Sequence, residues 1–245
     1  MPNLNSRIKA GSAFLGGVLL IAACGSTSPL PQPEPQPEPS EQVGAILGRV
    51  TPPEGARRVQ TAIEGIGTSV DTEGKFGLAL PNAATMTSTY RDELFPVYRP
   101  PTPPNEFGDS VFGLCQDVTE DAPDALLVFP INELRTDTGR TLVQDRGQLS
   151  DSSDKITTWW FSSQDVIFSF KGNCTALGQI DTTLTFKRGW NAVATEYFGD
   201  RTTYTVVEQP QTVQPWTDYG AAIGNLSLHP NILAPWKSLP QYRNR

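Results

Sequence analysis

Few residues of this chain have the type and spacing that catalysis requires. His229 is the only histidine, and it lies beside Pro230 in a stretch with no clear periodicity. Histidine is the usual general base near neutral pH. The sequence has neither a G-x-S-x-G motif for a hydrolase nucleophile nor a glycine-rich nucleotide motif, and its distant cysteines do not provide the short-spaced ligands of a zinc site. The sequence therefore predicts no catalytic residue, no bound metal and no cofactor.

Carboxylates are plentiful, but nothing in the sequence brings two of them to one place. Asp151 and Asp154 form one short acidic cluster, and Glu120, Asp121 and Asp124 form another. Either cluster could bind Ca²⁺ together with backbone oxygens, although neither has the spacing of an EF-hand loop. Solvated surface loops are the simpler interpretation of both. A hydrolase that uses two acids stays open, because composition alone does not exclude it.

Two adjacent tryptophans are the strongest indication of a ligand-binding surface. Trp159 and Trp160 lie in an apolar run, and successive side chains of a β-strand point to opposite faces. One of them can enter a core, while Trp160 could stand exposed and stack on a sugar ring or contact a protein partner. The alternative is that Trp160 packs beneath a loop or the C-terminal tail, against Trp216 or Trp236.

The first residues have the pattern of an export signal. Arg7 and Lys9 precede a run of 14 mostly apolar residues, 10–23. A membrane-spanning helix needs about 20 apolar residues, so this run is too short for a permanent anchor. It ends in Leu-Ile-Ala-Ala before Cys24, and this ending resembles the lipobox of bacterial lipoprotein precursors, with Ile21 where leucine is more usual. The resemblance implies cleavage before Cys24 and lipid attachment to its thiol; an ordinary signal peptide with an unrelated cysteine is the alternative.

The remaining cysteines, Cys115 and Cys174, form an even pair in the part expected to be exported. Exported thiol pairs tend to oxidise, so the sequence predicts a disulfide between them. Two free, buried thiols are the alternative.

The charge balance excludes some partners. Without Arg7 and Lys9 the chain carries 17 basic and 26 acidic residues, a formal charge of −9. An acidic chain without a cluster of Lys or Arg argues against nucleic acid and against a polybasic patch that binds a membrane surface.

A proline-rich segment follows Cys24. Residues 26–42 carry six prolines at alternate positions, from Pro29 to Pro39. Such a run lacks backbone donors and has fixed φ angles, which favours an extended polyproline-like conformation. At about 3.1 Å per residue the segment would reach roughly 50 Å. The sequence therefore predicts a spacer that lifts a domain from the membrane; a ligand for a proline-binding domain is the alternative.

From Gly44 onward, apolar residues often recur at every second position, which is typical of β-strands. The 21 glycines and 22 prolines favour many turns and few long helices. We expect strands at residues 45–50, 59–63, 76–80, 126–130, 157–163, 165–172, 184–186, 190–195 and 202–207. The predicted fold class is all-β, with one or more antiparallel β-sandwiches behind a signal peptide and a disordered proline-rich linker.

Two motifs resemble known β-modules. Residues 44–81, with the frame GRV…SVDTEGKFGLALP, are similar to the opening of carboxypeptidase-regulatory-like or transthyretin-like β-sandwiches. Residues 184–193, LTFKRGWNAV, resemble a G-W-N hairpin found in secreted and lipoprotein β-modules of unknown role. Both resemblances imply fold class and compartment, and neither brings a catalytic residue with it.

These observations divide the chain into five predicted parts. They are a signal peptide (1–23), the lipidated Cys24 with its linker (24–43), a β-sandwich-like segment with a long irregular loop (44–125), an antiparallel β-module (126–212) and an irregular tail (213–245).

The sequence predicts an envelope lipoprotein, held in the cell membrane or outer membrane by the lipid on Cys24 and facing outward from the cytoplasm. Its β-module would have a structural or binding role without enzymatic activity, and an envelope protein or polysaccharide would be its partner. The second hypothesis is an accessory module that binds carbohydrate or peptidoglycan through a line of exposed aromatics. The third is a hydrolase, which would need two carboxylates about 5–10 Å apart in a cleft.

Substitution of the single histidine tests the absence of general-base chemistry. We expect His229→Ala to leave every measurable property of the mature protein unchanged, because no nucleophile motif accompanies this residue. The thermal midpoint and a panel of hydrolase substrates provide the measurement. A hydrolytic activity that this substitution abolishes would contradict the non-catalytic interpretation of the whole chain.

Overall fold

The computed structural model describes residues 41–218, apart from 43, 54, 101–109, 113–114, 145–153 and 176. The predicted signal peptide, Cys24, most of the proline-rich linker, His229 and Trp236 lie outside the described residues. The part of the chain from Pro39 onward forms one compact unit.

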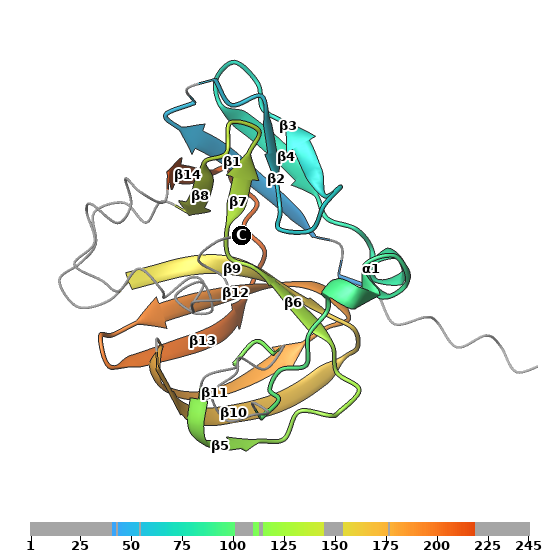
Figure 1. Cartoon of the computed structure of the whole chain (residues 1–245), viewed down its shortest axis with the longest axis vertical. Helices are drawn as coiled ribbons and strands as arrows, with labels where there is room; N and C mark the ends of the chain where they lie inside the picture. The colour runs from blue at the N-terminus through green and yellow to red at the C-terminus, as the bar shows by residue number, and fades with distance from the viewer. Residues whose placement is uncertain are drawn as a thin grey trace, which may run out of the picture. The chain divides into compact units, whose positions relative to one another are not determined.

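Strands dominate the described residues, and the predicted all-β class is confirmed (Figure 1). In chain order the elements are β1 (Ala45–Thr51), β2 (Arg58–Gln60), β3 (Gly67–Ser69), β4 (Lys75–Ala79), α1 (Ala83–Ser88), the 3-10 turn η1 (Arg91–Glu93), β5 (Cys115–Glu120), β6 (Val128–Ile131), β7 (Leu134–Thr136), β8 (Thr141–Gln144), β9 (Asp154–Ser162), β10 (Val166–Cys174), β11 (Gly178–Phe186), β12 (Gly189–Tyr197), β13 (Arg201–Val207) and β14 (Gln214–Asp218).

The described strands form two sheets of seven strands each. The first sheet has the order β3-β2-β7-β8-β14-β1-β4, and its two end strands, β3 and β4, lie beside each other, so this sheet curls round on itself. The second sheet has the order β5-β10-β11-β13-β12-β9-β6. Most neighbours are antiparallel, as expected, but β1 runs parallel to β14 and β11 runs parallel to β13.

The two sheets do not follow the predicted segments 44–125 and 126–212. Strand β5 precedes residue 126 yet belongs to the second sheet, whereas β7 and β8 follow residue 126 and belong to the first. The chain passes from one sheet to the other at several points, one of which is the short link Asn132–Glu133 between β6 and β7. The prediction of an irregular tail from residue 213 is wrong for residues 214–218, because β14 pairs with β1 on one side and β8 on the other.

Strands β9 and β12 are buried on both faces. Trp159 and Phe161 of β9 and Trp190 of β12 belong to one hydrophobic cluster, while Trp160 and Val193, which point the other way along the same strands, belong to a second cluster. Seven consecutive residues of β12, from 189 to 195, are buried. A strand covered on both faces needs a nearly continuous apolar run, which these sequences supply.

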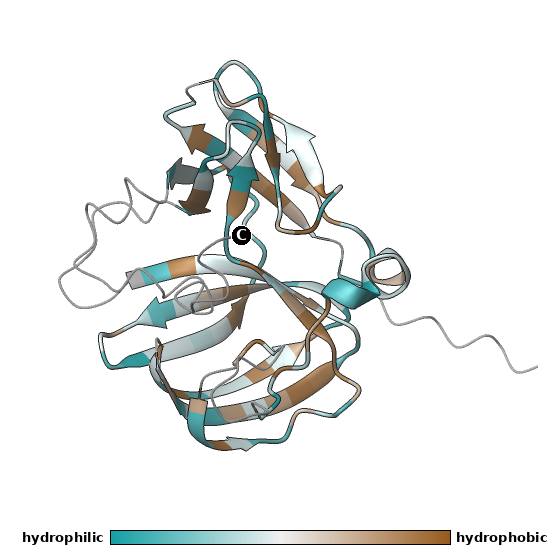
Figure 2. Ribbon diagram, in the orientation of Figure 1, coloured by the Kyte–Doolittle hydropathy of each residue, from teal (hydrophilic) through white to brown (hydrophobic). Residues whose placement is uncertain are grey.

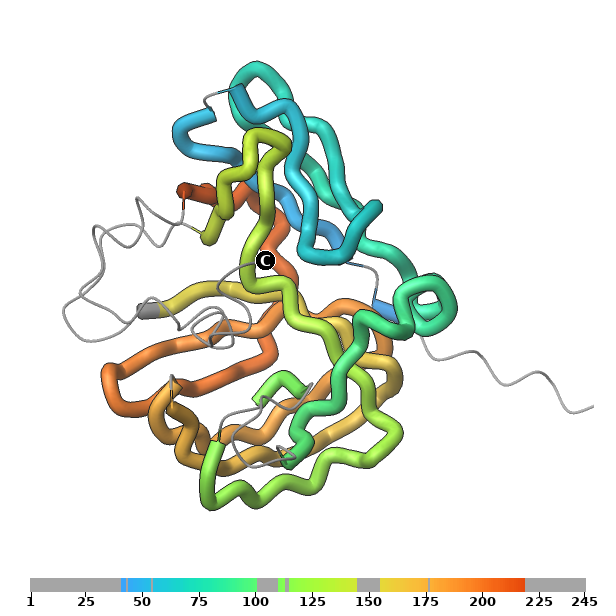
Figure 3. Tube along the Cα trace, in the orientation of Figure 1, coloured from blue at the N-terminus to red at the C-terminus, as the bar shows by residue number. Residues whose placement is uncertain are grey.

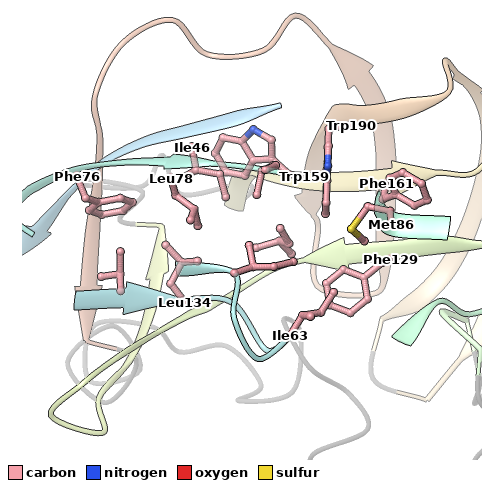
Figure 4. Close-up of a cluster of buried hydrophobic side chains, with 14 of the residues drawn as sticks. Ile46, Ile63, Phe76, Leu78, Met86, Phe129, Leu134, Trp159, Phe161 and Trp190 are labelled. Carbon is pink, nitrogen blue, oxygen red and sulfur yellow. The ribbon is translucent and has the colours of Figure 1, made fainter. Parts of the chain in front are cut away.

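The first cluster joins the two sheets (Figure 4). Ile46, Leu78 and Leu134 of the first sheet pack with the outward side chains of β9 and β12 on the second, and Met86 of α1 is a fully buried member. Trp159 packs against Trp216 of β14, with ring centroids 6.1 Å apart. The contact between the sheets is therefore a hydrophobic core rather than a solvated domain interface.

The second cluster fills the concave side of the second sheet. Phe168, Phe170 and Phe186 contribute buried aromatic rings from β10 and β11. Phe112 stacks on Phe170 with ring centroids 4.2 Å apart and also contacts Trp160. Aromatic pairs at such distances stabilise a core beyond the area that they bury.

The described residues of segment 82–125 form α1, η1 and β5, which is more regular structure than the predicted long irregular loop. Asn82 caps α1 by accepting a hydrogen bond from the Thr85 N–H at 2.8 Å. Phe95 then exchanges two backbone hydrogen bonds with Val128, of 2.9 and 2.8 Å, and Phe112 is buried in the second cluster. Its prolines exclude long strands, as expected, but its apolar side chains attach it to both clusters.

Truncation of one side chain of the first cluster tests the core that the two sheets share. We expect Phe161→Ala to lower the free energy of unfolding by about 3–5 kcal/mol, because the substitution leaves a cavity between the sheets. The matched control is Ile167→Ala on neighbouring β10, where the side chain is 69% exposed and the expected change is within about 0.5 kcal/mol. Denaturant titration measures both, and equal losses for the two variants would contradict the packing described.

Candidate functional site

The predicted disulfide is confirmed between Cys115 of β5 and Cys174 of β10. The two cysteines are directly opposite each other in the antiparallel pair, with Cα atoms 3.9 Å apart. Both are buried. The bond fastens β5, the end strand of the second sheet, to β10, the strand that carries Phe168 and Phe170 into the second cluster.

Trp160 does not lie on an exposed face. Its side chain is 2% exposed and packs with Phe112, Phe186 and Tyr204, at centroid distances of 5.9, 5.9 and 5.7 Å. Its indole N–H donates a hydrogen bond to Thr158 Oγ1 at 2.9 Å, and the same burial raises the pKa of the Tyr204 hydroxyl. The predicted stacking of a ligand on Trp160 is incompatible with this placement, because the residue belongs to the aromatic core.

The acidic cluster that follows β5 has a local structural role. A Glu120 carboxylate oxygen accepts a hydrogen bond from the Ala122 N–H at 2.6 Å, and an Asp121 carboxylate oxygen accepts one from the Ser169 N–H. These bonds fix the turn after β5 and tie it to β10. Within the described ranges, no group of three or more His, Cys, Asp or Glu residues could hold a metal ion. Asp151 and the side chain of Asp154 fall outside those ranges.

The outward side chains of β10, β11 and β13 form the most regular exposed surface among the described strands, here called the polar face. Buried and more exposed residues alternate along β10 and β11 and over the first five residues of β13, and Figure 2 shows hydrophobic and hydrophilic residues alternating along parts of β10 and β11. Exposed residues of β10 and β11 are paired in register, with Ile167 opposite Thr185, Ser169 opposite Thr183 and Lys171 opposite Asp181. The members of the polar face are Ile167, Ser169, Lys171, Asp181, Thr183, Thr185, Thr203 and Thr205.

The chemistry of the polar face is hydrogen bonding. Ser169 Oγ and Thr183 Oγ1 are 3.1 Å apart, and the Lys171 ammonium lies 2.9 Å from an Asp181 carboxylate oxygen. An exposed ion pair of this kind contributes at most about 1 kcal/mol to stability, so it leaves the surface polar and near neutral. The exposed large hydrophobic residues of the described chain are Ile167 and Val213, and neither is aromatic. The polar face therefore suits contact with another polar surface better than stacking on sugar rings.

The G-W-N motif of residues 189–191 forms a junction at the β11–β12 turn. Trp190 is fully buried and donates its indole N–H to the Pro81 carbonyl at 2.7 Å. Asn191 closes the turn, because its Oδ1 accepts from the Lys187 N–H at 3.0 Å and its Nδ2 donates back to the Lys187 carbonyl at 2.8 Å. The indole N–H of Trp190 and the side-chain amide of Asn191 are therefore both used in structural hydrogen bonds.

Comparison with known proteins adds no assignment. No protein-family model matches the sequence, and no curated protein or solved structure has significant similarity to the chain. Within the part of the chain that the structure describes, there is no helix with the length and apolar character needed to cross a membrane.

Two features of the surface were missing from the sequence interpretation. The polar face was detectable as the repeated T-x-T pattern at 183–185 and 203–205, in which threonines alternate with inward residues. The sequence indicated a motif at residues 189–191 but not what it contacts, because its partners, residues 42 and 81, are far away in the sequence.

Removal of the disulfide tests its contribution to the second sheet. The bond encloses 58 residues, and we expect the Cys115→Ala/Cys174→Ala variant to lose roughly 2–4 kcal/mol of unfolding free energy, because its unfolded chain is less constrained. Denaturant titration of oxidised, reduced and variant protein measures the loss. Non-reducing peptide mapping of natively exported protein should recover the two cysteines in one linked peptide pair; two alkylatable thiols in that material would contradict the bond.

Proposed function

We propose that this chain is an envelope lipoprotein with a non-catalytic structural or binding role. It is exported, cleaved before Cys24, held in the cell membrane or outer membrane by lipid on that cysteine, and carries its all-β module outward on the proline-rich spacer. The anchor on Cys24 is its contact with the membrane, and an envelope protein or polysaccharide is its proposed partner.

The pairing of the cysteines is the observation that best supports this proposal. The chain has three cysteines, and Cys115 and Cys174 are bonded to each other. Disulfides persist mainly in oxidising compartments outside the cytosol, which supports export. The pairing leaves Cys24 as the one thiol available for modification, and its sequence context resembles a lipobox.

The surface of the module supports a binding or structural role over recognition of carbohydrate by exposed aromatic side chains. The described tryptophans, Trp159, Trp160, Trp190 and Trp216, are all buried, so none of them supports recognition of carbohydrate by stacking. The polar face instead offers hydroxyl groups and one ion pair on three adjacent strands, which can form hydrogen bonds to a partner without requiring a cleft.

Acyl labelling tests the anchor. We expect the mature protein, expressed in a bacterium that processes lipoproteins, to incorporate a palmitate analogue, to partition into the detergent phase and to have a mass that corresponds to diacylglyceryl modification at Cys24. Two acyl chains bind a bilayer stably whereas one binds only marginally, so partition should be nearly complete.

Two variants provide the controls for this measurement. Cys24→Ser should lose both label and detergent partition, whereas Cys115→Ala/Cys174→Ala should keep both, since these cysteines lie in the folded module. A wild-type product with an unmodified Cys24 that remains in the aqueous phase would refute the proposal.

A further inference from the structure

The end of the predicted spacer is part of the fold. Gln42 pairs in parallel with Gly189: its N–H donates to the Arg188 carbonyl, and its carbonyl accepts from the Trp190 N–H, both at 2.9 Å. One residue earlier, a Glu41 carboxylate oxygen accepts a hydrogen bond from the Ala83 N–H at the start of α1. In Figure 3 the short blue trace of residues 41–42 accordingly lies beside α1.

Position 189 admits this contact only because it is a glycine. Gly189 has φ of +98°, which other residues rarely adopt. A Cβ built there would lie 2.3 Å from the Gln42 carbonyl oxygen, far inside contact distance. The buried Trp190 and the side-chain hydrogen bonds of Asn191 hold the turn in the conformation that accepts Gln42.

We infer that the G-W-N turn is a clamp for the tether: it binds residues 41–42 and fixes the orientation of the module relative to the end of the spacer. This inference rests on the proposed function, because only an anchored chain has a tether to hold. The part of the spacer that is bound to the module then begins at Glu41, ahead of the first strand.

The clamp determines which part of the module is remote from the tether. Strand β1 begins at Ala45, directly after the clamped residues, and its seven residues lead away from the clamp over roughly 20 Å. Three turns gather at its far end. The Val50 N–H donates to the Gly74 carbonyl at 2.8 Å, and Arg140 Nη2 donates to the Pro52 carbonyl at 3.2 Å. These turns therefore lie at the end of β1 that is remote from the clamped residues 41–42.

Amide hydrogen exchange on the full mature lipoprotein in detergent tests the clamp. In the wild type, the Gln42 and Trp190 amides should be protected to a similar degree, while residues of the proline-rich spacer exchange freely. Gly189→Ala should accelerate exchange at Gln42 and Trp190 by about tenfold or more, the change expected when one hydrogen bond's net stabilisation is lost. The matched control is Gly199→Ala at the other end of β12, where φ is +85° but an added Cβ meets no atom within 4 Å; it should leave both amides protected.

A second pair of variants changes only residues of the spacer segment. Gln42→Pro removes the N–H that binds Arg188 and should accelerate exchange at Trp190, whereas Gln36→Pro within the spacer should not. Free exchange of Gln42 in the wild type, or equal effects of Gln42→Pro and Gln36→Pro on Trp190, would overturn the clamp. Neither result depends on the acyl mass of Cys24, so failure of the clamp and failure of lipidation are distinguishable.

Discussion

Two-sided burial of β9 and β12 is the constraint on which the rest of the structure depends. Each strand presents large side chains to both faces, so two separate hydrophobic layers are needed to cover them. The first sheet provides one layer, and the curl of the second sheet provides the other. One polar group buried between these layers is paired locally: Thr158 Oγ1 donates to the Val193 carbonyl and accepts from the Trp160 indole N–H. The indole of Trp160 is therefore buried with its N–H hydrogen-bonded.

The burial of β9 and β12 on both faces also explains why a binding surface must be sought on the exposed side of the module. Side chains that look reactive or adhesive in the sequence, above all Trp159 and Trp160, are used in packing. The polar face remains exposed on the second sheet. Its ion pair contributes little to stability, so its polar groups can form contacts with a partner at little loss of stability. The junction at Gly189 also binds Gln42, so the end of the predicted spacer contacts the core at one turn.

Local pattern was enough to predict the long strands and the class. Alternation located β1, β4, β9, β10, β12 and β13 with small errors at their ends but found only the last three residues of β11, and cysteine parity identified the Cys115–Cys174 bond. The strands β7, β8 and β14 escaped prediction because their three to five residues do not alternate between apolar and polar types. Trp160 was ambiguous for a deeper reason: sequence shows that adjacent side chains oppose each other, but only tertiary structure shows whether a second layer covers both. The T-x-T pattern indicated an exposed polar face, but the sequence did not show how β11 pairs in register with β10.

The parallel pairing of β1 with β14 has a consequence for the order in which the molecule can be built. Gly48 of β1 pairs in register with Gln214 of β14, so this edge of β1, the first strand of the described chain, stays open until almost all of the described residues have been synthesised. Closing a loop of this length costs conformational entropy before the strand contacts form, so folds with such pairings form slowly. The strands β9 to β13 of the second sheet follow one another in sequence, so their pairings close shorter loops. A chain that emerges from its first residue onward can pair β1 with β4 early, but the other edge of β1 stays exposed, and available for association with other chains, until the last described strand arrives.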